Sequence, residues 1–200
     1  GVQIRVAQDQ EVQVSSRSVF QGYYQDYQAT EAAFDQGWFR TGDAGYLDRD
    51  GHLLIIGRKE EIIRNKSGEA FSPDFIETRL KFSPFIKDVF VVGDKTRSFV
   101  GVVVNIDFEY VSNWAERKRI PFTTFADLSQ KPEVGELIRK EVEKVNQRLP
   151  SGLRVKRFVN TPKAFDPDEA ELTRTMKLRR GFMEDRYKSL VEAIYGAEEV

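Results

Sequence analysis

GWFRTGDAGYLDRDGHLLIIGRKEEIIRNKSGEAFSP, from Gly37 to Pro73, is the most informative stretch of this chain. It contains Thr41-Gly42-Asp43, and then a turn from Asp48 to Gly51 that leads into the apolar run Leu53–Ile56. That run ends at Gly57-Arg58, and a second glycine follows at Gly68. A strand, a glycine and a lone charge, occurring twice, indicate backbone arranged around a polar ligand, because glycine allows close approach.

Composition predicts an ordered globular chain. It has 200 residues, 40% of them hydrophobic, with 15 Phe and a net charge of −1, so no overall charge attracts nucleic acid or an anionic membrane. Residues 1–57 carry four Arg, no Lys and eight acids, a charge of −4. The other 143 residues carry 27 basic and 24 acidic side chains, a charge of +3. The change near residue 57 indicates a domain boundary.

Several classes of site are excluded by residue counts. Without cysteine there is no disulfide framework and no thiolate metal site. With His52 as the one histidine, a multi-histidine metal cluster is excluded, and His52 reads as a solvated turn residue. No apolar run approaches the ~18 residues that a membrane span needs. Because the chain opens directly in a strand pattern, we expect a segment cut from a longer protein.

The chain reads as strands interleaved with helices. We expect short strands within residues 1–15, a helix at 30–34 capped by Thr30, and a helix that begins at Ser72-Pro73. Further along we expect strands at 86–92, 98–106 and 155–159, helices at 108–118, 132–149 and 181–195, and a loop at 121–129. The run at 98–106 is almost continuously apolar, which predicts a strand covered on both faces. The fold class for residues 58–200 is therefore α/β or α+β.

Asp43 and Arg58 are the first candidate ligand-binding residues. The Asp43 carboxylate, beside a glycine, suits the acceptance of hydrogen bonds from a pair of hydroxyls. The alternative is an aspartate that bonds its own turn. Arg58, at a strand end, can bind hydroxyls or phosphate, or it can pair with Glu60 or Glu61 at the surface.

Two other stretches leave similar choices open. Lys66-Ser67-Gly68 predicts a tight turn in a basic loop, where Gly68 either admits another chain or is an ordinary loop glycine. Leu172–Arg180, LTRTMKLRR, holds four basic residues and follows an acidic loop. It reads as a solvated helix start, a functional lysine on a loop, or a phosphate or nucleic-acid patch. The aromatics Tyr23, Tyr24, Trp38 and Phe39 suit packing or a binding cage.

Three of these stretches together resemble the adenylate-forming superfamily, which includes acyl-CoA synthetases, adenylation domains and luciferases. GWFRTGD (37–43), GRKEEIIRNKSGEAFSP (57–73) and LTRTMKLRR (172–180) are similar to three of its core motifs, in the same order. The form of the last motif looks most like the long-chain fatty-acid–CoA ligases. The resemblance covers the whole chain, whereas the chain covers only the last third or so of such an enzyme.

The resemblance implies a domain organisation. Residues 1–57 would be the β-rich end of the large AMP-binding N-terminal domain, 58–60 the hinge, and 61–200 the small mobile C-terminal α+β domain. The family's ATP phosphate loop, its magnesium-binding glutamate and its acyl pocket would lie before residue 1. We therefore expect a chain that is inactive alone and depends on the missing N-terminal domain.

The resemblance also implies roles for residues. Asp43 and Arg58 would bind the ribose hydroxyls of ATP, and Lys177 would be catalytic, bridging the fatty-acid carboxylate and the α-phosphate. Glu60 would be the hinge. The candidates for the CoA channel and the second half-reaction are Arg64, Lys66, Gly68 and Glu69.

The sequence departs from the family pattern in three places. The family usually has Asp or Lys at Glu60 and often Gly at Met176, and the loop at 64–69 is one residue longer than the common form. That extra residue leaves open how Arg64 and Lys66 divide their roles.

The implied substrates are ATP, a fatty acid and CoA, with Mg²⁺ held by the missing region, no nucleic-acid partner, and no metal ligand in this chain. We expect a cytoplasmic protein, with peripheral membrane contact as an open alternative. Two competing readings remain. One is an adenylation domain for another carboxylic acid, of the peptide-synthetase or aryl-acid type. The other is a non-catalytic interaction module.

Overall fold

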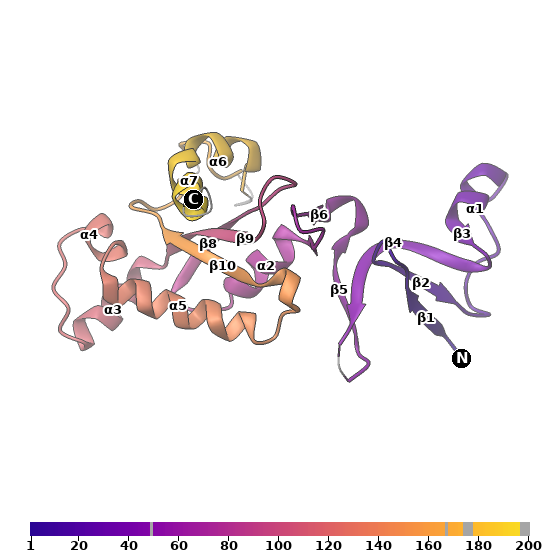
Figure 1. Ribbon diagram of the computed structural model, residues 1–200, viewed down its shortest axis with the longest axis horizontal. Coiled ribbons are helices and arrows are strands. Elements are labelled where there is room, and N and C mark those ends of the chain that lie inside the picture. Colours follow the sequence, from indigo (N-terminus) through magenta and orange to yellow (C-terminus); the bar gives the residue numbers. More distant parts are fainter. Residues whose placement is uncertain (49, 167, 174–177, 197–200) are drawn as a thin grey trace. The chain divides into compact units, whose positions relative to one another are not determined.

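The computed structural model describes residues 1–48, 50–166, 168–173 and 178–196 (Figure 1). Contacts divide the chain into two compact units, Gly1–Ile62 and Ile63–Val200. The division falls just beyond the hinge predicted at residues 58–60. In the part of the chain that the structure describes, no helix combines the length and apolar character that a bilayer crossing requires.

The first unit is an antiparallel sheet built around one long strand, β4 (Trp38–Leu47). Strands β2 (Glu11–Ser15), β3 (Phe34–Asp35) and β5 (Leu53–Arg58) all pair with β4, and β1 (Gln3–Val6) extends the sheet from β2. A 3₁₀ turn, η1 (Lys59–Glu61), follows β5. Because β4 is shared, the TGD segment and the end of β5 lie in one hairpin.

Helix α1 (Tyr27–Ala33) contacts β3 and β4, at the end of β4 where the two strands pair. The helix begins three residues earlier than expected. The predicted cap, Thr30, is wrong, because the Asp26 carboxylate accepts a hydrogen bond from the amide of Ala29 and caps the helix. The rings of Phe20, Tyr23, Phe34 and Phe39 lie 5.0–5.7 Å apart beside the helix. Of the four aromatics considered for a binding cage, Tyr23 and Phe39 therefore pack, and Tyr24 lies 89% exposed.

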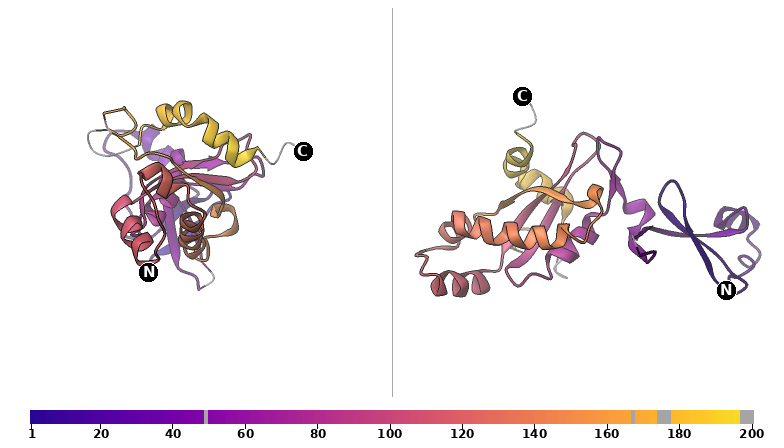
Figure 2. Two further views of the ribbon diagram at one scale, coloured as in Figure 1. Left: turned by 90° about the vertical axis from the view of Figure 1, so that its left-hand side faces the viewer. Right: turned by 60° about the horizontal axis from the view of Figure 1, so that its bottom comes forward.

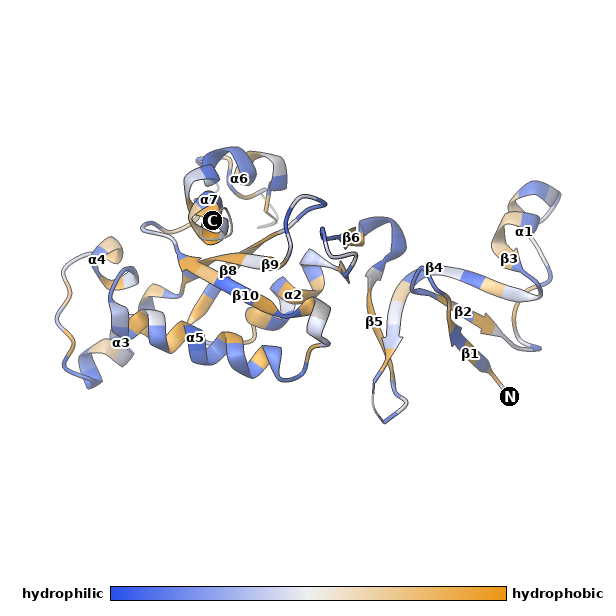
Figure 3. Cartoon of the chain, viewed as in Figure 1, coloured by the Kyte–Doolittle hydropathy of each residue, from blue (hydrophilic) through white to orange (hydrophobic). Residues whose placement is uncertain are grey.

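The second unit is organised around a three-stranded mixed sheet. Strand β9 (Val100–Ile106) lies in the middle, antiparallel to β8 (Ile86–Val92) and parallel to β10 (Val155–Asn160). Every residue of β9 is buried, which confirms the prediction of a strand covered on both faces. Figure 3 shows the apolar residues concentrated in β8 and β9.

Helices cover both faces of this sheet (Figure 2). One face carries α2 (Pro73–Leu80) and α5 (Pro132–Asn146). The other carries α6 (Arg180–Arg186) and α7 (Lys188–Tyr195). The remaining elements are α3 (Phe108–Arg117), α4 (Phe125–Ser129), η2 (Ser151–Leu153) and a hairpin of β6 (Ile63–Arg64) with β7 (Ala70–Phe71). This arrangement is the mixed α+β fold that the sequence predicts.

Helix boundaries show where local signals succeed. Ser72 caps α2 through the amide of Phe75, and Pro73 occupies its first turn, as predicted. The predicted loop at 121–129 is wrong, because it contains α4. The single helix predicted at 181–195 is also wrong, because the backbone leaves helical geometry at Tyr187 and separates α6 from α7.

Candidate functional site

Asp43 and Arg58 form a pair across the β4–β5 hairpin. They are opposite each other in the strand register, and Nη1 of Arg58 lies 3.1 Å from Oδ1 of Asp43. The two side chains are 36% and 61% exposed, respectively. A pair this exposed contributes about 0–1 kcal/mol to stability. A carboxylate and a guanidinium thus lie side by side at the surface, and the partner of Arg58 is Asp43 rather than Glu60 or Glu61.

The backbone that presents Asp43 is held by Thr41 and Gly42. The Thr41 hydroxyl donates to the Val12 carbonyl at 2.7 Å and accepts from the Asp43 amide at 3.1 Å. Gly42 has φ +72°, a left-handed conformation that costs any residue with a Cβ about 1–2 kcal/mol. An added Cβ would also lie 3.8 Å from Nη1 of Arg58. The TGD sequence thus specifies a turn that directs the Asp43 carboxylate towards Arg58.

Glu11, in the neighbouring strand β2, bonds to both sides of this hairpin. This residue was not identified from the sequence. Its side chain is 4% exposed and accepts from Arg40 and Lys59, each at 3.0 Å, and from the amide of Gly42 at 3.3 Å. Burial raises the pKa of Glu11, but the hydrogen bonds from Lys59 and Arg40 outweigh burial and lower it overall. Glu11 therefore stays ionised and ties together the residues on either side of the Asp43–Arg58 pair.

Lys59 also binds Asp9, with its Nζ 2.6 Å from the Asp9 carboxylate. The hydrogen bond to Asp9 raises the pKa of Lys59 and lowers that of Asp9. In sequence, Glu11 and Asp9 look like exposed residues of a strand and a turn. No local signal could have found partners that are so distant in the chain.

The loop that carries Arg64, Lys66, Gly68 and Glu69 is a tight hairpin organised by Asn65. The Asn65 side chain, almost fully buried, accepts from the Glu69 amide at 2.9 Å and donates to the Glu69 carboxylate at 3.2 Å. Gly68 has φ +80°, and Arg64 donates to its carbonyl at 3.2 Å. Gly68 and Lys66 are exposed, so the loop offers an open glycine beside two cations.

Lys177 lies outside the residues that the structure describes, but the residues that flank it are described. Leu172 and Leu178 form an antiparallel bridge, and the Arg179 amide donates to the Glu171 carbonyl at 3.0 Å. Arg180 binds Asp74 at 2.9 Å and Glu77 at 2.8 Å. Because Arg180 is already neutralised, it does not support a phosphate or nucleic-acid patch at this end of the motif.

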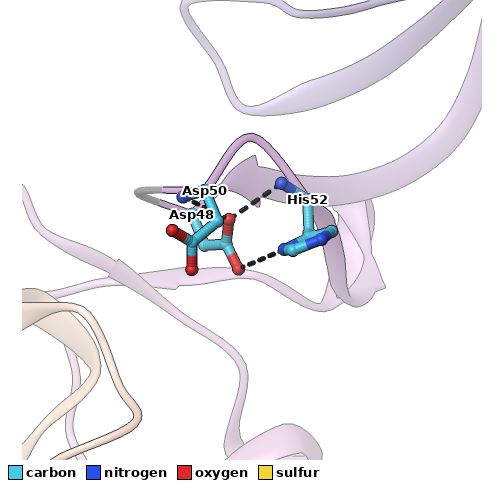
Figure 4. Close-up of side chains that lie close together, drawn as sticks. All are labelled: Asp48, Asp50 and His52. Carbon is cyan, nitrogen blue, oxygen red and sulfur yellow. Dashed lines mark hydrogen bonds and ion pairs between the residues drawn. The ribbon is translucent and has the colours of Figure 1, made fainter.

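Asp48, Asp50 and His52 cluster in the turn between β4 and β5, where His52 lies exposed as predicted (Figure 4). One oxygen of Asp48 accepts from the amides of Asp50 and His52, at 2.9 and 2.8 Å, and the other lies 3.2 Å from Nδ1 of His52. The hydrogen bond from the His52 amide is the main cause that lowers the pKa of Asp48. These bonds are those of a side chain that stabilises its own turn.

A protein-family comparison decides the family. The family model of the AMP-binding enzyme C-terminal domain matches residues 60–199. The chain belongs to this family. The predicted resemblance to adenylate-forming enzymes is confirmed, and the match begins at Glu60, whose hinge role stays a prediction.

The similar curated proteins are longer than this chain. A long-chain-fatty-acid–CoA ligase of Mycobacterium tuberculosis is 37% identical over 199 residues, covering 99% of this chain and 33% of the relative. Long-chain-fatty-acid–CoA ligase 1 of Homo sapiens is 32% identical over 195 residues, covering 95% of this chain and 28% of the relative. The chain therefore spans about a third of the length of the curated relatives it matches.

Solved structures agree at the level of the fold. The adenylation domain of a carboxylate reductase from Mycobacterium chelonae gives a TM-score of 0.58 at 22% identity, covering 98% of this chain and 31% of that chain. Apo MatB from Rhodopseudomonas palustris gives 0.58 at 19% identity, covering 94% and 34%. At these identities the likeness establishes the α+β fold alone.

Proposed function

We propose that this chain is the C-terminal part of an AMP-forming long-chain fatty-acid–CoA ligase. The observation that carries the proposal is the Asp43–Arg58 pair, built by a TGD turn in a chain that resembles such ligases over 99% of its length. In the first half-reaction a carboxylate oxygen attacks the α-phosphorus of ATP and pyrophosphate leaves. In the second, the CoA thiol attacks the acyl carbonyl, and AMP leaves.

Asp43 and Arg58 suit recognition of the ribose of ATP. A half-exposed carboxylate can accept hydrogen bonds from both ribose hydroxyls, while the adjacent guanidinium donates to them. Glu11 keeps the two strands that carry this pair in place. Binding through these groups is common to ATP and acyl-AMP, so it serves both half-reactions.

Lys177 would stabilise the charge shared by the attacking carboxylate and the α-phosphate. An ammonium acts as a point charge, and it is worth most when charge develops in a water-poor site. For the second half-reaction we propose that the chain turns about Glu60, so that Arg64, Lys66, Gly68 and Glu69 line the channel for CoA. An exposed glycine at φ +80° leaves room for an extended thiol arm.

The remaining partners belong to the whole enzyme. The substrates are ATP, a fatty acid and CoA, and the N-terminal domain supplies the phosphate loop and the acyl pocket. Among the residues that the structure describes, Asp48, Asp50 and His52 are the one group spaced to hold a cation, and their bonds are taken up by the turn. We propose, from the resemblance alone, that the Mg²⁺ ligand lies in the N-terminal domain and that the enzyme is cytoplasmic.

The test is Lys177→Ala in the full-length ligase that contains this chain. We expect loss of acyl-AMP formation, measured by ATP–pyrophosphate exchange, with thioester formation from supplied acyl-AMP retained within about twofold. The adenylation step needs the lysine charge in its transition state, whereas thiol transfer does not. Equal loss in both half-reactions would contradict the assignment of Lys177 to adenylation.

A further inference from the structure

Glu171 is a fully buried carboxylate with four partners. Its side chain is 0% exposed. One oxygen accepts from the hydroxyl of Tyr187 at 2.6 Å and lies 2.9 Å from Nζ of Lys163 and 3.8 Å from Nε of Arg186. The other oxygen accepts from the amide of Asp166 at 2.8 Å. Both oxygens of this carboxylate therefore have partners.

The same residue closes the base of the loop that leads to Lys177. We call the bridged residues Leu172 and Leu178 the loop base. Beside them, the Glu171 carbonyl accepts from the Arg179 amide at 3.0 Å. Leu172 is buried in the apolar cluster beneath α6 and α7, and Leu178 packs against that cluster. The backbone carbonyl of Glu171 thus bonds next to the loop base, and its side chain is anchored one residue before Leu172.

The partners of Glu171 belong to the rigid part of the second unit. The Lys163 carbonyl accepts from the Asn105 amide group at 3.1 Å and from the Thr161 hydroxyl at 2.7 Å, at the ends of β9 and β10. Tyr187 lies between α6 and α7, and its ring packs 5.5 Å from that of Phe165. The carboxylate therefore connects the loop base to the sheet on one side and to the two last helices on the other.

Neutralising Lys163 and Arg186 does not require Glu171. Glu169, with a side chain 45% exposed, already binds Lys163 at 2.5 Å and Arg186 at 2.6 Å. Burying a second carboxylate is costly, and an apolar residue of similar size is often as stable or more so. The side-chain and backbone bonds of Glu171 are instead placed beside the loop base, where they can hold it.

We infer that Glu171 is a positioning residue for the adenylation half-reaction, which holds the loop base so that the residues between Leu172 and Leu178 meet the reacting groups. The inference rests on the proposed function, since it needs Lys177 to act in adenylation. Misplacing a reacting group by about 1 Å can reduce a rate by about 10²-fold. The proposed ribose site, Asp43–Arg58, lies in the other unit, so we expect the KM for ATP to be unchanged in a Glu171 variant.

Two of the donors to Glu171, Tyr187 and Lys163, have raised pKa values. Burial and the hydrogen bond to Glu171 both raise the pKa of Tyr187, so it remains a donor. Burial lowers the pKa of Lys163, but hydrogen bonds with Glu169 and Glu171 outweigh burial and raise it overall. Both shifts favour the protonated forms of Tyr187 and Lys163, in which they donate to Glu171.

The test is Glu171→Gln in the full-length ligase that contains this chain. A glutamine keeps the size of the side chain but replaces one accepting oxygen with an NH₂ group, which would face donors. We expect kcat of ATP–pyrophosphate exchange to fall at least about tenfold, with the KM for ATP unchanged, because the loop base loses its position. Thioester formation from supplied acyl-AMP should stay within about twofold, which also shows that the variant is folded.

Glu169→Gln is the matched control, because Glu169 binds the same two cations from an exposed position. We expect both half-reactions of Glu169→Gln to stay within about twofold of the parent. Tyr187→Phe keeps the ring packing and removes one donor to Glu171, so it should show a smaller fall confined to exchange. If Glu171→Gln leaves exchange intact, lowers both half-reactions equally, or matches Glu169→Gln, the inference is wrong.

Lys177→Ala separates this result from a failure of the proposed function. If Lys177→Ala leaves exchange intact, the assignment of the loop to adenylation fails, and the inference fails with it. If Lys177→Ala abolishes exchange while Glu171→Gln does not alter it, only the positioning role of Glu171 fails.

Discussion

Glu77 is a buried carboxylate in the second unit with a pKa that departs from its ordinary value. One oxygen accepts from the Val91 amide at 2.9 Å and lies 2.8 Å from Nη2 of Arg180. Burial raises the pKa of Glu77 above 4.5, and the attraction of Arg180 opposes burial only in part. The folded chain therefore holds a proton at Glu77 to a higher pH than the unfolded chain does.

This raised pKa predicts how stability changes with pH. Above about pH 4.5 the folded state binds more protons at Glu77 than the unfolded state, so this group's contribution to the free energy of unfolding falls as the pH rises. The fall is complete above the raised folded-state pKa. We expect the difference in unfolding free energy between the parent and Glu77→Gln to decrease over that window, measured by denaturant titration at several pH values.

Asp74→Asn is the control for this measurement. Asp74 binds the same arginine, but its side chain is 77% exposed. Because burial is the main cause of the raised pKa of Glu77, the fall with pH should persist when Glu77→Gln is compared with its parent in the Asp74→Asn background. A parent minus Glu77→Gln difference that rises through the same window would contradict a raised pKa at Glu77.

Gly42 gives a second prediction at the level of one residue. Gly42→Ala places a Cβ at φ +72°, so we expect the free energy of unfolding to fall by about 1–2 kcal/mol. Denaturant titration of the chain checks this value. An unchanged stability would mean that the TGD turn takes another conformation than the one described.

Helix α5 allows the opposite glycine experiment. Gly135 lies inside α5, and an added Cβ would meet nothing within 4 Å. Gly135→Ala should therefore raise the free energy of unfolding by about 0.5–1 kcal/mol, because alanine loses less backbone entropy in a helix. The same titration compares it with Gly42→Ala, and a loss of stability would contradict the helical environment of Gly135.

Elements with strong local signals were predictable from sequence, and short ones were not. The strand at Ile86–Val92 and the Ser72 cap follow directly from the apolar run and the Ser-Pro pair. Helix α4 was missed although Thr124 accepts from the Asp127 amide and Asp127 accepts from the Thr123 amide. That capping pair was visible, but a five-residue helix shows too little periodicity to confirm it.

The break between α6 and α7 could not be predicted from the local sequence pattern. The apolar spacing continues through Tyr187, so periodicity predicts one helix. What sets Tyr187 apart is its hydroxyl, which donates to Glu171 sixteen positions earlier in the chain. A contact of that range cannot be read from local pattern.

At the scale of the whole molecule, the residues that could meet a ligand were predictable and their supports were not. Asp43 and Arg58 stood out because a turn glycine and a strand end lie beside them. Glu11 and Glu171 are buried polar residues with partners far along the chain, and Asn65 is a buried polar residue that organises its own hairpin. Their burial results from tertiary packing, so composition and periodicity assign them to the surface.

The isolated chain should not adenylate. We expect no ATP–pyrophosphate exchange from these 200 residues, because the proposed enzyme takes its phosphate loop and acyl pocket from the N-terminal domain. The full-length ligase that contains this chain, assayed in parallel with a fatty acid, is the positive control. Measurable exchange by the isolated chain would overturn the proposed division of the site.

The two-sided cover of β9 has a consequence for biosynthesis. The ribosome completes β9 about 80 residues before it begins α7, the helix that packs on β9. Translation proceeds at roughly 5–20 residues per second, so roughly 4–16 s pass between the synthesis of β9 and that of α7. For that time the apolar face of β9 that includes Val103 lacks the helix that buries it. During that interval the nascent chain exposes apolar surface that is prone to aggregation, and a ribosome-bound chaperone would bind the chain at this stage.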